Sequence, residues 1–409
     1  MRRTATPWLF ALVAMAGLLS ACGSSSSSST VAANNAAATS TPTQSAKASG
    51  SSGLTQAQAA LAQAYAGTDR ALPTSAPSVP KGKTVWILSC SESAPGCAVP
   101  AAAAAAAGSA IGWHMKVLDG KFDPATWNTL IRSAAAAHPD ALILDAVDCA
   151  ATQASLQAAK QAGVKIFGFY SFDCNDVYTG GRPLFNAALD VGSSNAGDSG
   201  SYAGFVENIF AKAQAAYAIV KTGGHANIIQ FYEADVAVAH HIGDGYDRWI
   251  KAWCPGCTIW KVPFTGQDLI TGKLQEKAAA ALTRYPTANV VAAPYDATIL
   301  LGIGPAVAAA KASGHKLLLT GGEGLAPNIA LIRKGVQDFA AGVATGWVGW
   351  ASIDGVIRMF DGQPQVDEGL GNGAVDQTHN LPAKTAYYDG NAKSQAYRAV
   401  YLKLWGVKP

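Results

Sequence analysis

The sequence predicts an α/β protein in which parallel sheets flanked by helices form two lobes. From Lys83 onward, short apolar runs alternate with alanine-rich stretches of helical length, which is the pattern of strand-helix-strand units. About 330 to 350 residues remain once an N-terminal leader and a polar tether are set aside, which is too many for one small core. The series of runs occurs twice, so one architecture is predicted for both halves.

Short apolar runs mark the predicted strands. In the first half these are Thr84 to Cys90, His114 to Leu118, Ala141 to Leu144 and Lys165 to Tyr170. Good helix formers fill the segments between them, at Val99 to Gly112, Pro124 to His138 and Ala150 to Ala162. In the second half, strands are predicted at Ala226 to Phe231, Thr258 to Val262, Val290 to Ala293, Lys316 to Thr320 and Phe339 to Val343, again with helical segments between them.

The N-terminus has the features of an export signal. Arg2 and Arg3 precede an apolar run from Pro7 to Leu19, which is shorter than the roughly 20 residues of a membrane-spanning helix. The segment Leu19-Ser20-Ala21-Cys22 resembles the lipobox of bacterial lipoproteins. We therefore expect residues 1–21 to be removed and Cys22 to be lipidated; the alternative is an ordinary cleaved signal with an incidental cysteine.

Residues 22–82 are expected to form the anchor, a tether and a lead-in arm. Gly23 to Gly53 is rich in small and polar residues and has too few large apolar ones to bury a core. Leu54 to Ala66 has helical composition, and three prolines follow it before residue 82. We expect a short helix that leads into an extended arm packed on the first lobe.

Charge and cysteine content limit the classes of function. The formal net charge is +3 without a block of like charges, which argues against nucleic acid because a basic patch or stripe meets the phosphate backbone. No metal-ligand motif accompanies the adjacent His240 and His241, and no metal or cofactor is expected. Seven cysteines minus Cys22 leave six, and an even number in an exported protein favours disulfides.

The pairing of these cysteines is open from sequence. Cys254 and Cys257 have the spacing of a redox pair, but they follow a helical segment, so a structural disulfide is favoured over redox catalysis. The other four lie near strand ends of the first lobe: Cys90, Cys97, Cys149 and Cys174. Three pairings are possible, and if the third and fourth strands are neighbours, Cys149 pairs with Cys174 and Cys90 with Cys97.

Ligand sites in parallel sheets lie beyond the carboxyl ends of the strands. The residues at those positions are mainly acidic and aromatic: Ser91, Glu92, Asp119, Asp145, Asp148, Tyr170, Ser171, Phe172, Asp173, Tyr232, Glu233, Asp235, Phe264, Tyr295, Asp296 and Glu323. The candidate ligand-binding residues among them are Ser91, Glu92, Asp145, Asp148, Tyr170, Phe172, Phe264, Tyr295, Asp296 and Glu323. Carboxylates accept hydrogen bonds from hydroxyl or ammonium groups, and aromatic faces suit sugar C–H surfaces or a cation. Alternatively, single members are turn or N-cap residues.

Two segments resemble a known family, the type I periplasmic binding proteins. The first reads HPDALILDAVDCAATQASLQAAKQAGVKIFGF and is similar to that family's third strand, helix and fourth strand. The second reads PYDATILLGIGPAVAAAKASGHKLLLTGGEGLAPNIALIRKG and is similar to a later block. The resemblance runs from about Lys83 to Gly362 and points to the ribose-like sugar-binding branch of ABC importers.

The resemblance implies two Rossmann-like lobes, a hinge of three crossover strands, and a ligand clamped between the lobes. Lobe 1 would comprise 83–193 and 345–368, and lobe 2 would comprise 194–344 and 369–409.

Candidate ligand-binding positions carry over from the family one at a time. Asp145 stands where sugar binders often have Asn, Asp148 and Asp296 match family aspartates, and Glu323 replaces another aspartate. In addition, His240 falls near the family's sugar-binding arginine, and Asn195 sits in an expected crossover.

The sequence also departs from the family pattern. The Asp-Arg pair that normally closes the fourth strand is Tyr170-Ser171, and Val343 stands where a polar residue is expected. These changes remove the arginine that usually grips a sugar ring. A sugar is expected, but no particular sugar is.

The leading hypothesis is a monomeric solute-binding lipoprotein on the outer face of the cell membrane. It would capture a small polar ligand, a sugar or related polyol, and deliver it to the permease and ATPase of an ABC importer. Catalytic residues are not expected, because no nucleophile elbow, phosphate loop or zinc motif occurs. The alternatives are a ligand-sensing receptor for a membrane signalling protein, and a binder of an amine or aromatic metabolite.

Overall fold

The computed structural model describes residues 45–192, 201–383, 386–390, 394 and 396–407. Cys22, the leader and the first part of the tether lie outside the described residues, as does Asn195. Among the helices of the described part, none is both long and apolar enough to span a bilayer.

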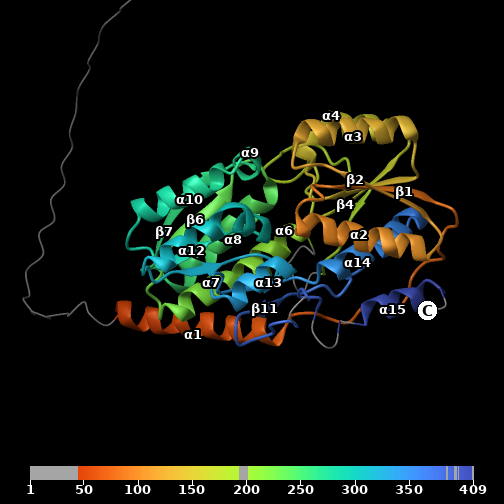
Figure 1. The fold of residues 1–409 in the computed structure, drawn as a ribbon. Helices are drawn as coiled ribbons and strands as arrows, with labels where there is room; N and C mark the ends of the chain where they lie inside the picture. The colour runs from red at the N-terminus through yellow and green to blue at the C-terminus, as the bar shows by residue number, and fades with distance from the viewer. Residues whose placement is uncertain (1–44, 193–200, 384–385, 391–393, 395, 408–409) are drawn as a thin grey trace, which may run out of the picture. The chain divides into compact units, whose positions relative to one another are not determined.

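A five-stranded parallel sheet forms the first lobe. Its order is β2-β1-β3-β4-β5, with β1 (Thr84–Ser89), β2 (His114–Asp119), β3 (Ala141–Asp145), β4 (Lys165–Phe169) and β5 (Ala187–Ala188). Helices α3 (Pro124–Ala137) and α4 (Cys149–Gln161) cover one face, and α2 (Pro95–Ala110) and α14 (Thr345–Asp361) cover the other (Figure 1). The central strand β3 is buried throughout, as expected for an apolar run covered on both faces.

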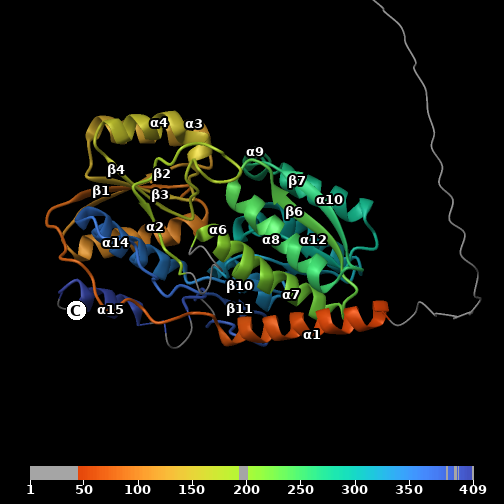
Figure 2. The ribbon, with the colours of Figure 1, turned by 180° about the vertical axis from the view of Figure 1, so that it is seen from behind.

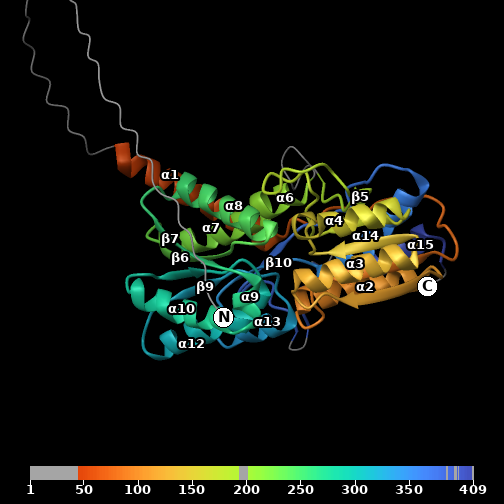
Figure 3. The same ribbon diagram turned by 90° about the horizontal axis from the view of Figure 1, so that it is seen from above.

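The second lobe is built around a four-stranded parallel sheet. Its order is β7-β6-β8-β9, with β6 (Asn227–Glu233), β7 (Thr258–Phe264), β8 (Val290–Ala292) and β9 (Leu318–Thr320). Figure 3 shows α7 (Ala211–Lys221) and α8 (Ala237–Trp253) on one face and α10 (Lys273–Arg284) and α12 (Gly304–Ala312) on the other. The remaining elements are α6 (Tyr202–Phe205), a π-helical turn Val206–Phe210, α9 (Gly266–Ile270), α11 (Asp296–Thr298), a π-helical turn Ile299–Ile303 and α13 (Ala326–Arg333).

The predicted α/β class with two lobes is confirmed. Every predicted strand lies within two residues of an observed strand at both ends. The last predicted strand, β10 (Ala340–Gly342), pairs antiparallel with β11 (Gly373–Val375), which the sequence pattern did not indicate. Two of the expected crossings between lobes are described, at 343–345 and 362–372.

The N-terminal helix is longer than predicted and packs on the second lobe. Helix α1 (Ser45–Ala66) begins inside the segment expected to be a tether, and it contacts α7, α8 and β11 of the second lobe (Figure 2). Its Gly53 lies against the backbone of Trp253, and a Cβ there would collide with it. The arm that follows does reach the first lobe, where Trp113 Nε1 donates to the carbonyl of Pro80 at 2.7 Å.

The C-terminal helix also differs from its expected placement. Residues 369–409 were assigned to the second lobe, whereas α15 (Tyr397–Leu404) packs against α14 of the first lobe. The ring of Trp405 stacks on Trp350 with centroids 5.6 Å apart, and its Nε1 donates to Asp354 Oδ1 at 2.9 Å. The resemblance to the family ends near Gly362, so it gives no information on where this C-terminal helix packs.

Three cysteine pairs lie at disulfide distance. Their Cα atoms are 5.8 Å apart for Cys90 and Cys97, 4.9 Å for Cys149 and Cys174, and 5.3 Å for Cys254 and Cys257. These separations fall in the usual range for a disulfide. The pairs are the ones favoured from the predicted strand order, because β3 and β4 are neighbours.

Loss of the Cys149–Cys174 link is expected to cost more stability than loss of Cys254–Cys257. The Cys149–Cys174 pair has a sequence separation of 25, and the Cys254–Cys257 pair has one of 3. Closing these loops lowers the entropy of the unfolded chain, which stabilises the folded state by about 3.5 kcal/mol for the first pair and about 1.6 kcal/mol for the second. Urea unfolding of Cys149→Ala/Cys174→Ala and Cys254→Ala/Cys257→Ala measures both. Equal losses, or other pairs in a peptide map of the unreduced chain, would contradict the assignment.

Candidate ligand-binding site

A cavity of about 320 Å³ lies where the carboxyl ends of both sheets meet; we call it the cleft cavity. The first lobe contributes residues that follow β1, β3 and β4, namely Cys90, Ala146 and Tyr170. The second lobe contributes Glu233 at the end of β6, and Tyr295 and Glu323 beyond β8 and β9. Because parallel strands place their carboxyl ends at one edge, both lobes present their ligand-binding edge to the same space.

Aromatic rings form much of the wall. The ring of Tyr202, at the start of α6, lies 5.3 Å from that of Tyr170, measured between centroids. Tyr170 has φ of 54°, a left-handed conformation that is uncommon for residues other than glycine. Phe122, Trp127, Phe205 and Phe210 complete the aromatic lining. Such faces can stack on the C–H surface of a ring or an extended polyol.

Glu233 is the most buried acid of the cavity lining. Glu233 is only 2% exposed, and the hydroxyl group of Tyr295 donates a hydrogen bond to Glu233 Oε2. Burial, the largest influence, raises the pKa of Glu233 to about 8. The carboxyl group is therefore largely protonated at neutral pH in the ligand-free protein and can donate as well as accept a hydrogen bond.

Glu323 and Asp296 form an acidic pair beneath the second-lobe wall. Glu323 Oε2 accepts from the backbone N–H of Asp296 at 2.9 Å, and Asp296 Oδ2 accepts from that of Leu325 at 2.7 Å. Burial raises the pKa of both carboxyl groups, and for Asp296 the nearby Glu323 adds to the effect. Glu323 lines the cavity, whereas Asp296 is buried behind it and holds the turn that presents Glu323.

Asp148 joins the lobes instead of lining the cavity. It was predicted to bind ligand, but its carboxylate accepts from the N–H of Phe172 in the first lobe at 2.9 Å and from that of Ala237 in the second at 3.0 Å. Burial raises the pKa of Asp148 to about 6. Asp145 is fully buried, its carboxylate oxygens have no partner among the described residues, and burial raises its pKa well above the ordinary value.

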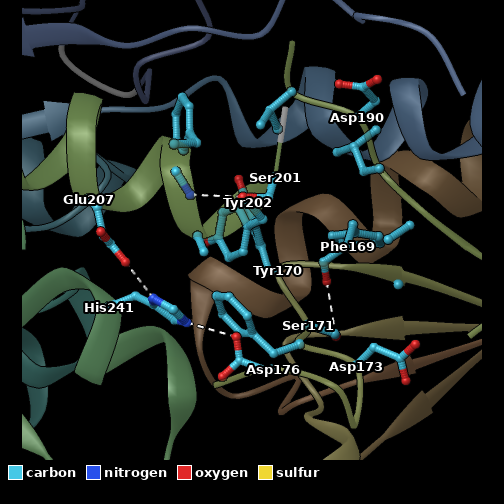
Figure 4. A pocket seen from close by; sticks show the side chains of 18 of the residues that line it. Phe169, Tyr170, Ser171, Asp173, Asp176, Asp190, Ser201, Tyr202, Glu207 and His241 are labelled. Carbon is cyan, nitrogen blue, oxygen red and sulfur yellow. Dashed lines mark hydrogen bonds and ion pairs between the residues drawn. The ribbon is translucent and has the colours of Figure 1, made fainter. Parts of the chain in front are cut away.

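A larger hollow of about 770 Å³ lies beside the cleft cavity and shares Tyr170 and Tyr202 with it; we call it the side cavity (Figure 4). Phe172 lines the side cavity and stacks on the ring of His241 at 4.7 Å. The ring nitrogens of His241 lie 2.9 Å from Asp176 Oδ2 and 2.7 Å from Glu207 Oε1. This lining lacks the strand ends of the second sheet, so the cleft cavity is the better candidate site.

Several predicted residues do not line the cleft cavity. Glu92 is exposed, and the hydroxyl of Ser91 bonds to that of Ser93 at 2.8 Å. The ring of His240 lies 3.0 Å from the carbonyl oxygen of Ala234, and His241 lines the side cavity in its place. The side chain of Phe264 packs in the hydrophobic core of the second lobe and therefore does not reach the cleft cavity.

Sequence reasoning missed Tyr202, Phe205 and Trp127. Tyr202 and Phe205 follow the first crossover, where the family resemblance indicates only a polar motif around Asn195. Trp127 lies within α3, and its indole reaches back so that Nε1 donates to the carbonyl of Cys90 at 3.3 Å. The position of Pro124 at the start of α3 could have indicated which first-turn side chains face the strand ends.

Solved structures share this fold. A glucose-galactose binding protein from Geobacillus stearothermophilus aligns with a TM-score of 0.60 and 15% identity, over 74% of this chain and 100% of that one. A solute-binding protein of an ABC transporter from Clostridium phytofermentas, with bound L-rhamnose, gives 0.60 and 15% over 75% and 98%. One from Agrobacterium vitis, with bound allitol, gives 0.55 and 16% over 73% and 96%.

Sequence comparison identifies the family. No curated protein matches the chain in sequence. The family model described as a periplasmic binding protein domain matches residues 87–364, which include both main sheets except the first three residues of β1, and the strand ends around the cleft cavity. The chain therefore belongs to the periplasmic binding protein domain family.

Proposed function

We propose that the protein is the substrate-binding component of an ABC importer and captures a small hydroxylated ligand, a sugar or polyol, in the cleft cavity. The observation that carries this proposal is a cavity of ligand size lined by strand ends of both lobes. The structural neighbours named above, with bound L-rhamnose or allitol, support the ligand class.

The ligand-binding residues we propose are Tyr170, Tyr202, Glu233, Tyr295 and Glu323. The two tyrosines at 170 and 202 would stack on C–H faces, while the carboxyl groups would exchange hydrogen bonds with hydroxyl groups. Since a ligand touches both lobes only when they are closed, binding shifts the population toward the closed state. We propose no chemical step, and a bound ligand should be recovered unchanged.

Contacts between the lobes would support the closed state. Asp148 links the backbones of Phe172 and Ala237, and Tyr178 of the first lobe donates its hydroxyl to Asp244 of α8. In the same region, Asp176 Oδ2 lies 2.9 Å from His241 Nε2. These contacts join the loops after β3 and β4 to α8 and lie beside the cavity, so closure and binding are coupled.

We further propose that the chain is a monomeric lipoprotein, anchored through Cys22 on the outer face of the membrane. The charged, apolar and small-residue regions of residues 1–22 support an anchored, exported chain. Three cysteine pairs at disulfide distance fit an oxidising compartment.

Truncation of Tyr202 is expected to weaken binding. A thermal-shift screen of the full chain in detergent against sugars and polyols should find a ligand that stabilises the protein saturably. The Tyr202→Ala variant should bind that ligand at least tenfold more weakly, because it lacks one of the stacking faces of the cavity. Tyr285→Ala is the matched control, because Tyr285 stacks on Trp260 at the opposite end of the second sheet. Equal affinity losses in the two variants would contradict the site.

Stability of the ligand-free protein is expected to fall as pH rises from about 5 to about 8. Folding raises the pKa of Asp148 to about 6 and of Glu233 to about 8, so the folded state keeps protons that the unfolded state has lost above about pH 4.5. Each group contributes at most about 1.4 kcal/mol per pH unit in its window. Melting temperatures across this range test the slope, which Glu233→Gln should make shallower; a rise with pH would contradict it.

Loss of Cys22 is expected to release the protein from the membrane. With Cys22→Ser no thiol remains for lipidation, so the chain should move from the detergent-rich to the aqueous phase in phase partition. Unchanged partition would show that the anchor is wrong.

A further inference from the structure

Resting on the function proposed above, we propose that the ligand of the cleft cavity carries a positive charge: it is an amino sugar or an aminated polyol.

The charged side chains of the lining all have one sign. Four acidic residues line the cavity: Asp123, Glu233, Asp235 and Glu323. None of the lining residues that the structure describes is Lys, Arg or His. Both carboxylate oxygens of Asp123 accept from backbone N–H groups, and so do both oxygens of Asp235. Glu233 and Glu323 each accept through Oε2, from Tyr295 and from the N–H of Asp296, so their Oε1 atoms are the acceptors left for a ligand.

Two further carboxyl groups lie behind the wall without a basic partner. Asp145 and Asp296 are buried, and in the described part of the chain neither they nor Glu233 and Glu323 form an ion pair with a basic side chain. Buried carboxylates without a counter-charge are unfavourable. A ligand cation placed between Glu233 and Glu323 would supply that counter-charge from outside the chain.

The aromatic wall suits the same ligand. The faces of Tyr170, Tyr202 and Trp127 offer negative π-electron density to an ammonium group and flat apolar surface to the carbon skeleton beside it. Tyr170 also has a buried hydroxyl with no partner among the described residues. A ligand with several hydroxyl groups and one ammonium group matches these features together.

A neutral sugar would bind differently. It would leave Glu233 and Glu323 protonated, as burial favours, and use them as hydrogen-bond donors. An ammonium ligand would instead favour their ionised forms and displace their protons. The two cases are therefore distinguished by matched ligands and by pH.

The decisive experiment is calorimetric titration of the full chain in detergent with matched pairs: glucosamine and glucose, galactosamine and galactose, mannosamine and mannose. At pH 7 we expect at least one amino sugar to bind at least tenfold more tightly than its neutral parent. Glu233→Gln and Glu323→Gln, which preserve side-chain size, should abolish that preference. Glu276→Gln on the exposed face of α10 is the control and should preserve it.

A second readout on the unmodified chain applies even if a variant fails to fold. Amine binding should release protons, detected as a dependence of the binding heat on the buffer's ionisation enthalpy, and amine affinity should rise between pH 5.5 and 7.5. If neutral parents bind as tightly as the amines, the charge inference is overturned and the proposed function stands. If no sugar in either form binds, both are overturned.

Discussion

Because all strands of the two main sheets run parallel, their carboxyl ends collect at one edge of each sheet, and the fold turns these edges toward one another. This constraint determines which residues can meet. Tyr170 and Glu323 are far apart in sequence but line one cavity, since each follows a strand of its own sheet. The helices and terminal segments cover the remaining faces and leave this region hollow.

Burial of carboxyl groups at these strand ends has a cost that the fold offsets locally. Asp148 and Asp296 accept backbone hydrogen bonds, and Glu233 accepts one from Tyr295. These contacts hold the acids in place without neutralising them. Desolvation is the largest influence on the pKa of each of these groups and raises it. Glu233, whose pKa it raises to about 8, therefore holds its proton near neutral pH until a ligand changes its surroundings.

Sequence patterns predicted the sheets better than the site. The apolar run from Ala141 to Leu144 is too short for a typical helix and is followed by polar residues, so it predicts a buried strand, and the residues after it are then expected at the carboxyl edge. Which of them face the cavity depends on single-residue orientation: His240 points away while His241 lines the side cavity, and Phe264 turns into the core. Tyr202 and α15 come from segments without a strand pattern, so their places depend on tertiary packing alone.

The central claim is that the cleft cavity, and not the side cavity, holds the ligand. A crystal structure of the protein with the tightest ligand from the sugar and polyol screen tests it most directly. We expect the ligand between the rings of Tyr170 and Tyr202 and the carboxyl groups of Glu233 and Glu323. A ligand bound beside His241 and Glu207, or outside both cavities, would contradict it.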